Sequence, residues 1–275
     1  MLEYPEIKTI VRQMENEIIG KTVAYGTLEK RNGNMFMNAA HVAQYSLFSG
    51  GTVVKIDCLA PDIYIMLDNG YGILICQSGG KILYNKTPSD APKNFNIIFG
   101  FSDSSSMTYT MSLFTLGFFA VSHDEWQKRK QSSQKFDPLG DHSFDDYMDF
   151  VRQCAVDELK KPIKTFLATN MLGVMSTYAA EILLYAKIYP STQVRKLDED
   201  ESRRVYDTMK RVLSEAVAAG GKNSEFNLFG KKGGYLAMAE RKHIGENCPV
   251  CDSTLEKNST AGVTAFCPKC QIKKA

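Results

Sequence analysis

Cys248-Pro-Val-Cys251 and Cys267-Pro-Lys-Cys270 are the stretches that decide how the last part of this chain folds. Each pair places two thiolates on one tight turn, and the 15 residues between the pairs suffice for a short hairpin that brings the turns together. Two such pairs are typical of a tetrahedral zinc site. Because four cysteines leave no position open for water, the sequence predicts one structural Zn²⁺ per chain. A redox pair or cysteines without metal is the alternative.

Length and composition indicate a globular protein of two domains. The chain has 275 residues, of which 44% are hydrophobic, and its net charge of +2 permits a polyanionic partner without demanding one. Seven cysteines is an odd number, and no signal peptide or long apolar run is apparent. We therefore expect a cytoplasmic protein that does not enter a membrane.

Residues 20–122 read as short β-rich runs separated by turns. The runs 63–67 and 71–75 flank Asp68-Asn-Gly70, which is typical of a hairpin. Apolar residues at helical spacing in 6–17 predict a short helix before the first strand. The first part of the chain is therefore expected to be an antiparallel β-domain with a leading helix.

The pattern becomes helical after a polar stretch at 127–142, which we interpret as a linker. Apolar residues recur at three- and four-residue intervals in 144–156, 162–169, 177–188 and 201–219. Asp198 or Asp200 is expected to cap the last helix, and Gly220-Gly221 to end it. The predicted fold class is α+β, with a β-domain at 1–126, a helical domain at 143–222, and a loop with the zinc hairpin at 223–275.

Three further stretches, in the same order along the chain, resemble one known family. They are Leu2-Glu-Tyr-Pro-Glu-Ile7, the segment from Ile163-Lys164 through Gly173-Val-Met-Ser-Thr-Tyr-Ala-Ala-Glu181, and Gly245-Glu-Asn-Cys-Pro-Val-Cys251 with Phe266-Cys-Pro-Lys-Cys-Gln271. The chain resembles a divergent member of the formamidopyrimidine-DNA glycosylase / endonuclease VIII family over its full length. The resemblance implies a β-sandwich, a helix-two-turn-helix domain and a zinc finger. It also implies base-excision DNA repair with glycosylase and AP lyase activity.

The resemblance further implies a partner and a place of binding. Damaged or abasic duplex DNA would lie between the two domains of a monomer, with the lesion nucleotide extruded toward Glu3. In a bacterium the protein would be associated with the nucleoid.

In that family the second residue is usually a proline whose α-amine attacks the sugar C1′, and this chain has Leu2 there. Removal of Met1 needs a small second residue, so Met1 is expected to stay and its amine to lie roughly 3.5 Å farther out. A misplacement of about 1 Å already spoils near-attack geometry. Glu3 and Glu6 match the family's carboxylates, and Glu3 would transfer protons on the opened sugar. Alternatively, Glu6 only complements the helix dipole.

Several positions that touch DNA in the family depart from its pattern. Asp62 falls near the position of a family lysine that binds phosphate. An aspartate there is expected to repel the DNA backbone. Ser176 stands where the family has an asparagine that contacts phosphate. Gly262 falls near the position of the arginine in the family's zinc-finger hairpin. Lys164 matches a family lysine, and either a phosphate contact or a solvated helix face would explain it. Glu181 is expected to be an exposed carboxylate on a packed helix.

The wedge and the basic residues complete the expected DNA contacts. Gln77 sits where the family inserts one wedge residue, and Phe114 or Leu116 could fill the void left by the extruded nucleotide. Lysines before and within the zinc ribbon would form a cationic rim that binds phosphates with little base readout. The principal candidates are Lys231, Lys232 and Lys242.

Three functional hypotheses remain open at this point. The first is a DNA-binding protein with the glycosylase fold whose amine chemistry is lost or altered. The second is a working glycosylase and AP lyase that uses the Met1 amine, or a lysine such as Lys55 or Lys81, together with Glu3. The third is a zinc-ribbon module that serves RNA or a protein partner.

Overall fold

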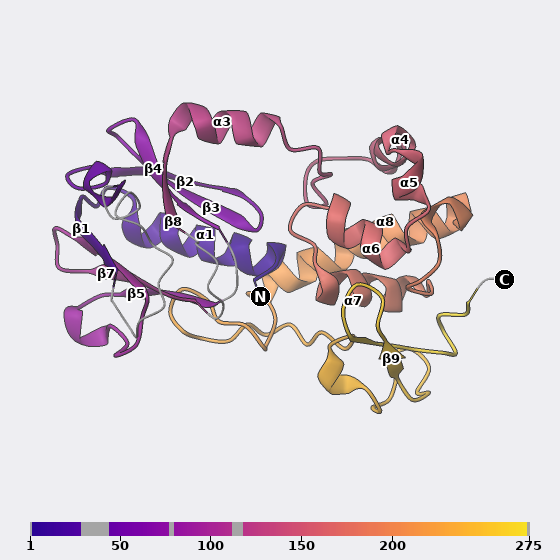
Figure 1. Cartoon of the computed structure of the whole chain (residues 1–275). Helices are drawn as coiled ribbons and strands as arrows, with labels where there is room; N and C mark the ends of the chain where they lie inside the picture. Colours follow the sequence, from indigo (N-terminus) through magenta and orange to yellow (C-terminus); the bar gives the residue numbers. More distant parts are fainter. Residues whose placement is uncertain (1, 29–43, 77–79, 112–117, 274–275) are drawn as a thin grey trace. The chain divides into compact units, whose positions relative to one another are not determined.

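The computed structural model describes residues 2–28, 44–76, 80–111 and 118–273, drawn in colour in Figure 1. The chain divides into two compact units. The first contains Met1–Ser133 and Gly220–Gly233, and the second contains Gln134–Ala219 and Gly234–Ala275. Among the described helices, none combines the length and the apolar character needed to cross a bilayer.

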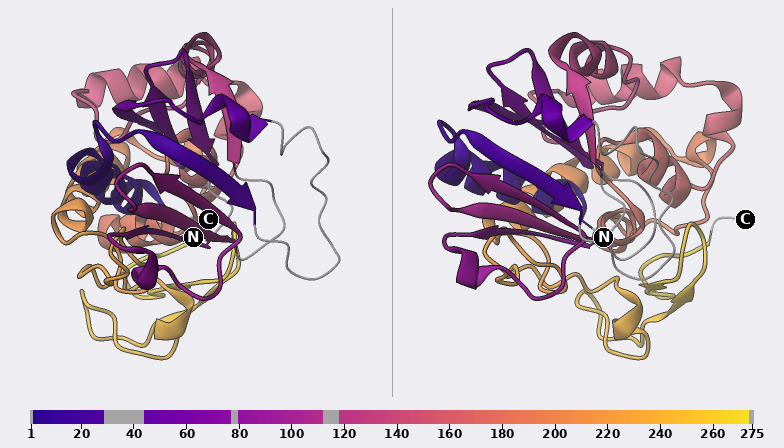
Figure 2. Two further views of the ribbon diagram at one scale, coloured as in Figure 1. Left: turned by 90° about the vertical axis from the view of Figure 1, so that its left-hand side faces the viewer. Right: turned by 60° about the vertical axis from the view of Figure 1, so that its left-hand side comes forward.

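Within the described residues, the first unit consists of two four-stranded antiparallel sheets and two α-helices, which confirms the expected β-domain. One sheet has the order β1-β6-β7-β5 and the other β2-β3-β4-β8, and Figure 2 shows them as separate layers. The strands are β1 (Val23–Leu28), β2 (Val53–Leu59), β3 (Asp62–Leu67), β4 (Tyr71–Ile75), β5 (Gly80–Asn85), β6 (Ile97–Phe101), β7 (Ser106–Met111) and β8 (Phe118–Ser122). The helices are α1 (Tyr4–Ile18) and α3 (His123–Gln131), with short 3-10 turns η1 (Gln44–Leu47) and η2 (Pro88–Asp90).

Helix α1 forms because its apolar residues lie on one face and its first turn is well capped. Ile7, Ile10 and Met14 are fully buried, and the helix contacts β2 and β3. The Glu6 carboxylate accepts a hydrogen bond of 2.8 Å from the backbone nitrogen of Glu3, the N-cap residue. The capping box therefore fixes where the helix begins, and the helix packs against the sheet that contains β2 and β3.

Helix α3 begins before the stretch interpreted as a linker and covers its first five residues, 127–131. Trp126 is fully buried, stacks on Tyr64 at 4.9 Å between ring centroids, and donates a 2.9 Å hydrogen bond from Nε1 to Asp57 Oδ2. One large aromatic side chain thus holds an otherwise polar helix on the second sheet, which apolar periodicity alone did not indicate. The division into units also departs from the expected boundaries at 220–233, because this segment bonds to residues of α1.

The second unit is helical, as expected, and ends in a small hairpin. Its helices are α4 (Phe144–Gln153), α5 (Val156–Leu159), α6 (Ile163–Asn170), α7 (Ser176–Ala186) and α8 (Glu199–Ala218), with 3-10 turns η3 (Val194–Lys196) and η4 (Arg241–His243) and strands β9 (Glu256–Asn258) and β10 (Thr264–Phe266). Asp198 caps α8 by accepting a 2.8 Å bond from the backbone nitrogen of Glu201. Gly220 follows the helix at φ +75°, which confirms the predicted end.

Glu181 of α7 is buried, so the expectation of an exposed carboxylate is wrong. Its oxygens accept bonds of 3.2 Å and 2.7 Å from the backbone nitrogens of Met238 and Ala239, and a 3.3 Å bond from the hydroxyl of Tyr235. Burial raises the pKa of Glu181 to about 7, although these hydrogen bonds act in the opposite direction. The carboxyl group thus ties α7 to the segment that leads into the hairpin.

Candidate functional site

Glu3, Glu6 and Lys222 form a buried charged cluster in the first unit. The ammonium nitrogen of Lys222 lies 2.7 Å from Glu3 Oε1 and 3.7 Å from Glu6 Oε2. All three side chains are 3% exposed. The structure therefore brings together the two carboxylates that the sequence singled out and adds a lysine that it did not.

The backbone of Lys222 is held in the same cluster. Its nitrogen donates a 2.8 Å hydrogen bond to Glu6 Oε1. Gly221 adopts φ +92°, and a side-chain carbon there would lie 2.8 Å from Glu6 Cγ, so only glycine permits this close approach. The Gly220-Gly221 pair that ends α8 consequently also sets the position of the lysine beside α1.

Burial and neighbouring charges shift the pKa values of this cluster in opposite directions. Burial by itself lowers the pKa of Lys222, but the carboxylates of Glu3 and Glu6 outweigh it and the pKa is raised. Burial raises the pKa of Glu6, with Lys222 opposing this change. The lysine is accordingly an ammonium ion at neutral pH, and Glu6 holds a proton more readily than an ordinary glutamate.

Leu2 lies next to this cluster in the sequence and is 1% exposed. Its isobutyl group is therefore part of the core of the first unit. Met1, whose amine is the nucleophile in the second functional hypothesis, lies outside the described residues. Gln77, Phe114 and Leu116, the expected wedge residues, also lie outside them.

Three positions where the family resemblance leads us to expect phosphate contacts lie together in the second unit. They are Lys164, Ser176 and Gly262. The Lys164 side chain is fully buried and donates bonds of 2.9 Å to Gly262 O and 2.7 Å to Thr264 Oγ1. The alternative of a solvated helix face is therefore wrong for Lys164. A phosphate contact would require its ammonium group to exchange these oxygens for those of the ligand.

Gly262 packs against the first residue of α7. It adopts φ +96°, and a side-chain carbon would lie 2.8 Å from Ser176 Oγ. An arginine at this position, as the family resemblance expects, would be strained and would collide with Ser176. Ser176 itself is half-buried at the N-terminus of α7, whose N-cap residue, Met175, makes no side-chain cap.

The four cysteines of the hairpin converge, as the two motifs predicted. Their sulfur atoms lie within 4.8 Å of one another, an arrangement that could hold a metal ion. Backbone nitrogens of Val250 and Cys270 donate to the sulfurs of Cys248 and Cys267 at 3.4 Å and 3.3 Å. Cys248 and Cys267 are buried in a small core with Ala180 and Leu184 of α7. The cluster therefore anchors the hairpin to the helical unit.

The other charged residues predicted from the sequence lie in both units. Asp62 forms an ion pair with Arg129, so its negative charge is compensated, which would reduce the expected repulsion of a DNA backbone. Lys231 and Lys232 are exposed on the 220–233 segment of the first unit. Lys242 belongs to the second unit, where it pairs with Glu240 at 2.6 Å.

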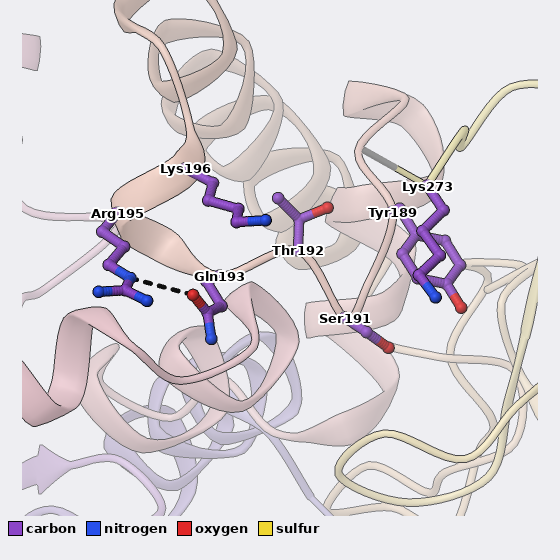
Figure 3. Close-up of a pocket in the computed structure, with 7 residues that line it drawn as sticks. All are labelled: Tyr189, Ser191, Thr192, Gln193, Arg195, Lys196 and Lys273. Atoms are coloured by element: carbon purple, nitrogen blue, oxygen red, sulfur yellow. Dashed lines mark hydrogen bonds between the residues drawn. The ribbon is translucent and has the colours of Figure 1, made fainter. Parts of the chain in front are cut away.

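A separate pocket of about 410 Å³ opens on the second unit, on the connection between α7 and α8 (Figure 3). Arg195, Lys196 and Lys273 give its lining a positive charge, and Arg195 Nε donates a 3.0 Å bond to Gln193 Oε1. None of the residues proposed from the sequence as catalytic or metal-binding lines it.

Similar proteins are found both among curated sequences and among solved structures. No family model matches the chain. The chain is 27% identical to the formamidopyrimidine-DNA glycosylase of Lactobacillus helveticus, over 99% of each protein, and 25% identical to that of Rickettsia bellii, over 98% of this chain and 99% of the relative. Its fold is similar to Lactococcus lactis Fpg (MutM) in complex with DNA containing N7-benzyl-Fapy-dG, with TM-score 0.83, 21% identity and coverage of 98% and 100%. It is also similar to the MutM (Fpg) protein from Thermus thermophilus, with TM-score 0.79, 22% identity and coverage of 99% and 100%.

Proposed function

This chain belongs to the formamidopyrimidine-DNA glycosylase family, and we propose that it binds duplex DNA carrying a damaged base or an abasic site, with the family's N-terminal amine chemistry altered. One observation carries the second half of this proposal. Leu2 replaces the proline that the family uses, whereas Glu3 is retained and is engaged by the ammonium group of Lys222 at 2.7 Å. A buried cluster of ionisable groups with perturbed pKa values, beside a carboxylate that the family uses, supports a functional role for this position.

The N-terminus of α7 is the best supported phosphate contact in the described residues. Helix N-termini attract anions, and the N-cap residue of α7, Met175, provides no side-chain cap. Ser176 adds a hydroxyl at the same place. The exposed ammonium groups of Lys231 and Lys232 would add salt-dependent attraction without reading the bases.

We propose that the four-cysteine cluster binds one structural Zn²⁺. Tetrahedral zinc with bonds of about 2.3 Å requires sulfurs roughly 3.8 Å apart, and Cys251 and Cys267 have their sulfurs at 3.5 Å. Four thiolates leave no open ligand position, so the ion would hold the hairpin in place and take no part in the chemistry.

The binding half of the proposal is tested on native gels with three duplexes of one sequence: intact, containing an abasic-site analogue, and containing a ring-opened purine. We expect tighter binding to both lesions than to the intact duplex. Ser176→Ala should weaken lesion binding about tenfold, since a hydrogen bond to a charged group contributes about 1.5 kcal/mol or more. Ser214→Ala on the exposed face of α8 is the matched control.

Two results would count against this function. Equal affinity for intact and lesion duplexes would remove the assignment to damaged DNA. Preferential binding of structured RNA in direct competition would favour the hypothesis of a zinc-ribbon module for RNA.

A further inference from the structure

The strongest unassigned feature of the molecule is Lys222, a buried lysine in contact with the carboxylate that the family uses for proton transfer. We propose that the Lys222 side-chain amine replaces the N-terminal amine as the nucleophile, and that it forms a Schiff base with C1′ of the opened sugar at an abasic site. This inference rests on the proposed function, because it requires that abasic DNA is bound.

The geometry places the amine where a proton can be exchanged in one step. Lys222 Nζ and Glu3 Oε1 are 2.7 Å apart, and Glu6 Oε2 lies at 3.7 Å. Both the lysine backbone and the start of α1 are fixed by the hydrogen bonds of Glu6. Such a preorganised arrangement of nucleophile, base and orienting group is what amine catalysis requires.

The two lysines that the sequence offered as alternative amines have different surroundings. Lys55 is exposed on β2, and Lys81 is exposed on β5 with its ammonium group 3.8 Å from the centroid of the Phe226 ring. Lys222 differs because it is desolvated beside a proton acceptor.

Lys222 has to lose a proton before its amine can attack. Lys222 is an ammonium ion at rest, and transfer of its proton to Glu3 converts two opposite charges into two neutral groups. Burial favours the neutral pair, whereas the attraction between the ammonium group and the carboxylates favours the charged pair at rest. Burial also raises the pKa of Glu6, so this carboxyl group takes up a proton more readily than an ordinary glutamate.

The chemical step then balances without any other reagent. The nitrogen lone pair forms the N–C1′ bond with the open-chain aldehyde, and the aldehyde oxygen leaves as water. Both hydrogens of that water come from Nζ by way of Glu3, so an ammonium ion and an aldehyde become a protonated imine and one water molecule. Glu3, ionised again, can take a C2′ proton. The C3′–O bond then breaks, and its electron pair leaves with the 3′-phosphate. Hydrolysis of the imine by one water restores the lysine ammonium.

The test is sodium borohydride trapping of the full-length protein on a duplex with one abasic site, followed by proteolysis and mass mapping of the adduct. We expect a stable adduct on the peptide that contains Lys222. Lys222→Arg keeps a cation but has no primary amine, and it should lose the adduct while still binding the duplex on a native gel. Lys86→Arg, an exposed lysine of the same unit, is the matched control and should trap like the wild type.

The outcomes separate this inference from the proposed function. An adduct mapped to Met1 or to another lysine overturns the inference and leaves DNA binding intact. Binding of the abasic duplex without any adduct does the same. Failure to bind any of the duplexes overturns both. The mapping is done on wild-type protein, so the inference remains falsifiable even where Lys222→Arg fails to fold.

Discussion

Replacement of Lys222 by methionine tests whether the charged cluster is as buried as the structure indicates. The methionine fills a similar volume but leaves Glu3 and Glu6 without their cation, at 3% exposure each. Removing one partner of a buried ion pair typically costs about 3 to 5 kcal/mol. We expect a loss of that size in the free energy of unfolding of the first unit at pH 7.

The loss should become smaller in acid. Without Lys222, burial has no opposing cation and raises the pKa of Glu6 further above its ordinary value. A raised folded-state pKa means that the folded form binds more protons than the unfolded form, so the folded variant is favoured as pH falls. The difference between variant and wild type should therefore shrink between pH 7 and pH 5.

Urea unfolding followed by tryptophan fluorescence suits this measurement. Trp126 is the single tryptophan of the chain, and it is buried in the same unit as Lys222. Lys21→Met is the matched control, because Lys21 pairs with Asp103, whose side chain is 47% exposed. Such surface pairs contribute about 1 kcal/mol or less. A Lys222→Met variant within about 1 kcal/mol of the Lys21→Met control, or one whose deficit grows in acid, would refute the buried cluster.

Three further predictions concern the second unit. Cys251→Ser, or removal of zinc by a chelator, should unfold the hairpin and weaken binding to abasic duplex, and unchanged affinity would contradict the structural role. Since the pKa of Glu181 is raised to about 7, wild-type stability should fall by up to about 3 kcal/mol as pH rises from about 4.5 to 7, and Glu181→Gln should flatten that dependence in calorimetry. Gly262→Ala should destabilise the unit by more than Gly245→Ala in thermal unfolding, because both glycines have φ above +90° but only a side chain at 262 would meet Ser176.

Local patterns in the sequence were sufficient for most of the secondary structure. Asp198 and the Gly220-Gly221 pair mark the ends of α8 because capping depends on residues within one turn. The four cysteines converge for a related reason, since each motif sets its own turn and a short hairpin joins them. Helix α3 was missed because a single tryptophan, rather than an apolar stripe, holds it in place.

The candidate site was predictable only in part. Glu3 and Glu6 were identified through the family resemblance, yet their partner Lys222 follows them by 219 and 216 residues. No periodicity or spacing connects positions so far apart. Likewise, the charges of Lys164 and Asp62 were visible in the sequence, but their partners were not.

The fold class, the metal-binding pattern and the family resemblance could be read from the sequence alone, because they depend on residue types at short and regular spacings. The partners of the charged groups are visible only in the folded chain: Asp62 pairs with Arg129 and Glu3 with Lys222, whereas the ammonium group of Lys164 donates to neutral oxygens of the hairpin. The protonation and reactivity of an ionisable group depend on burial and on charges within a few ångströms, and only folding brings those neighbours together.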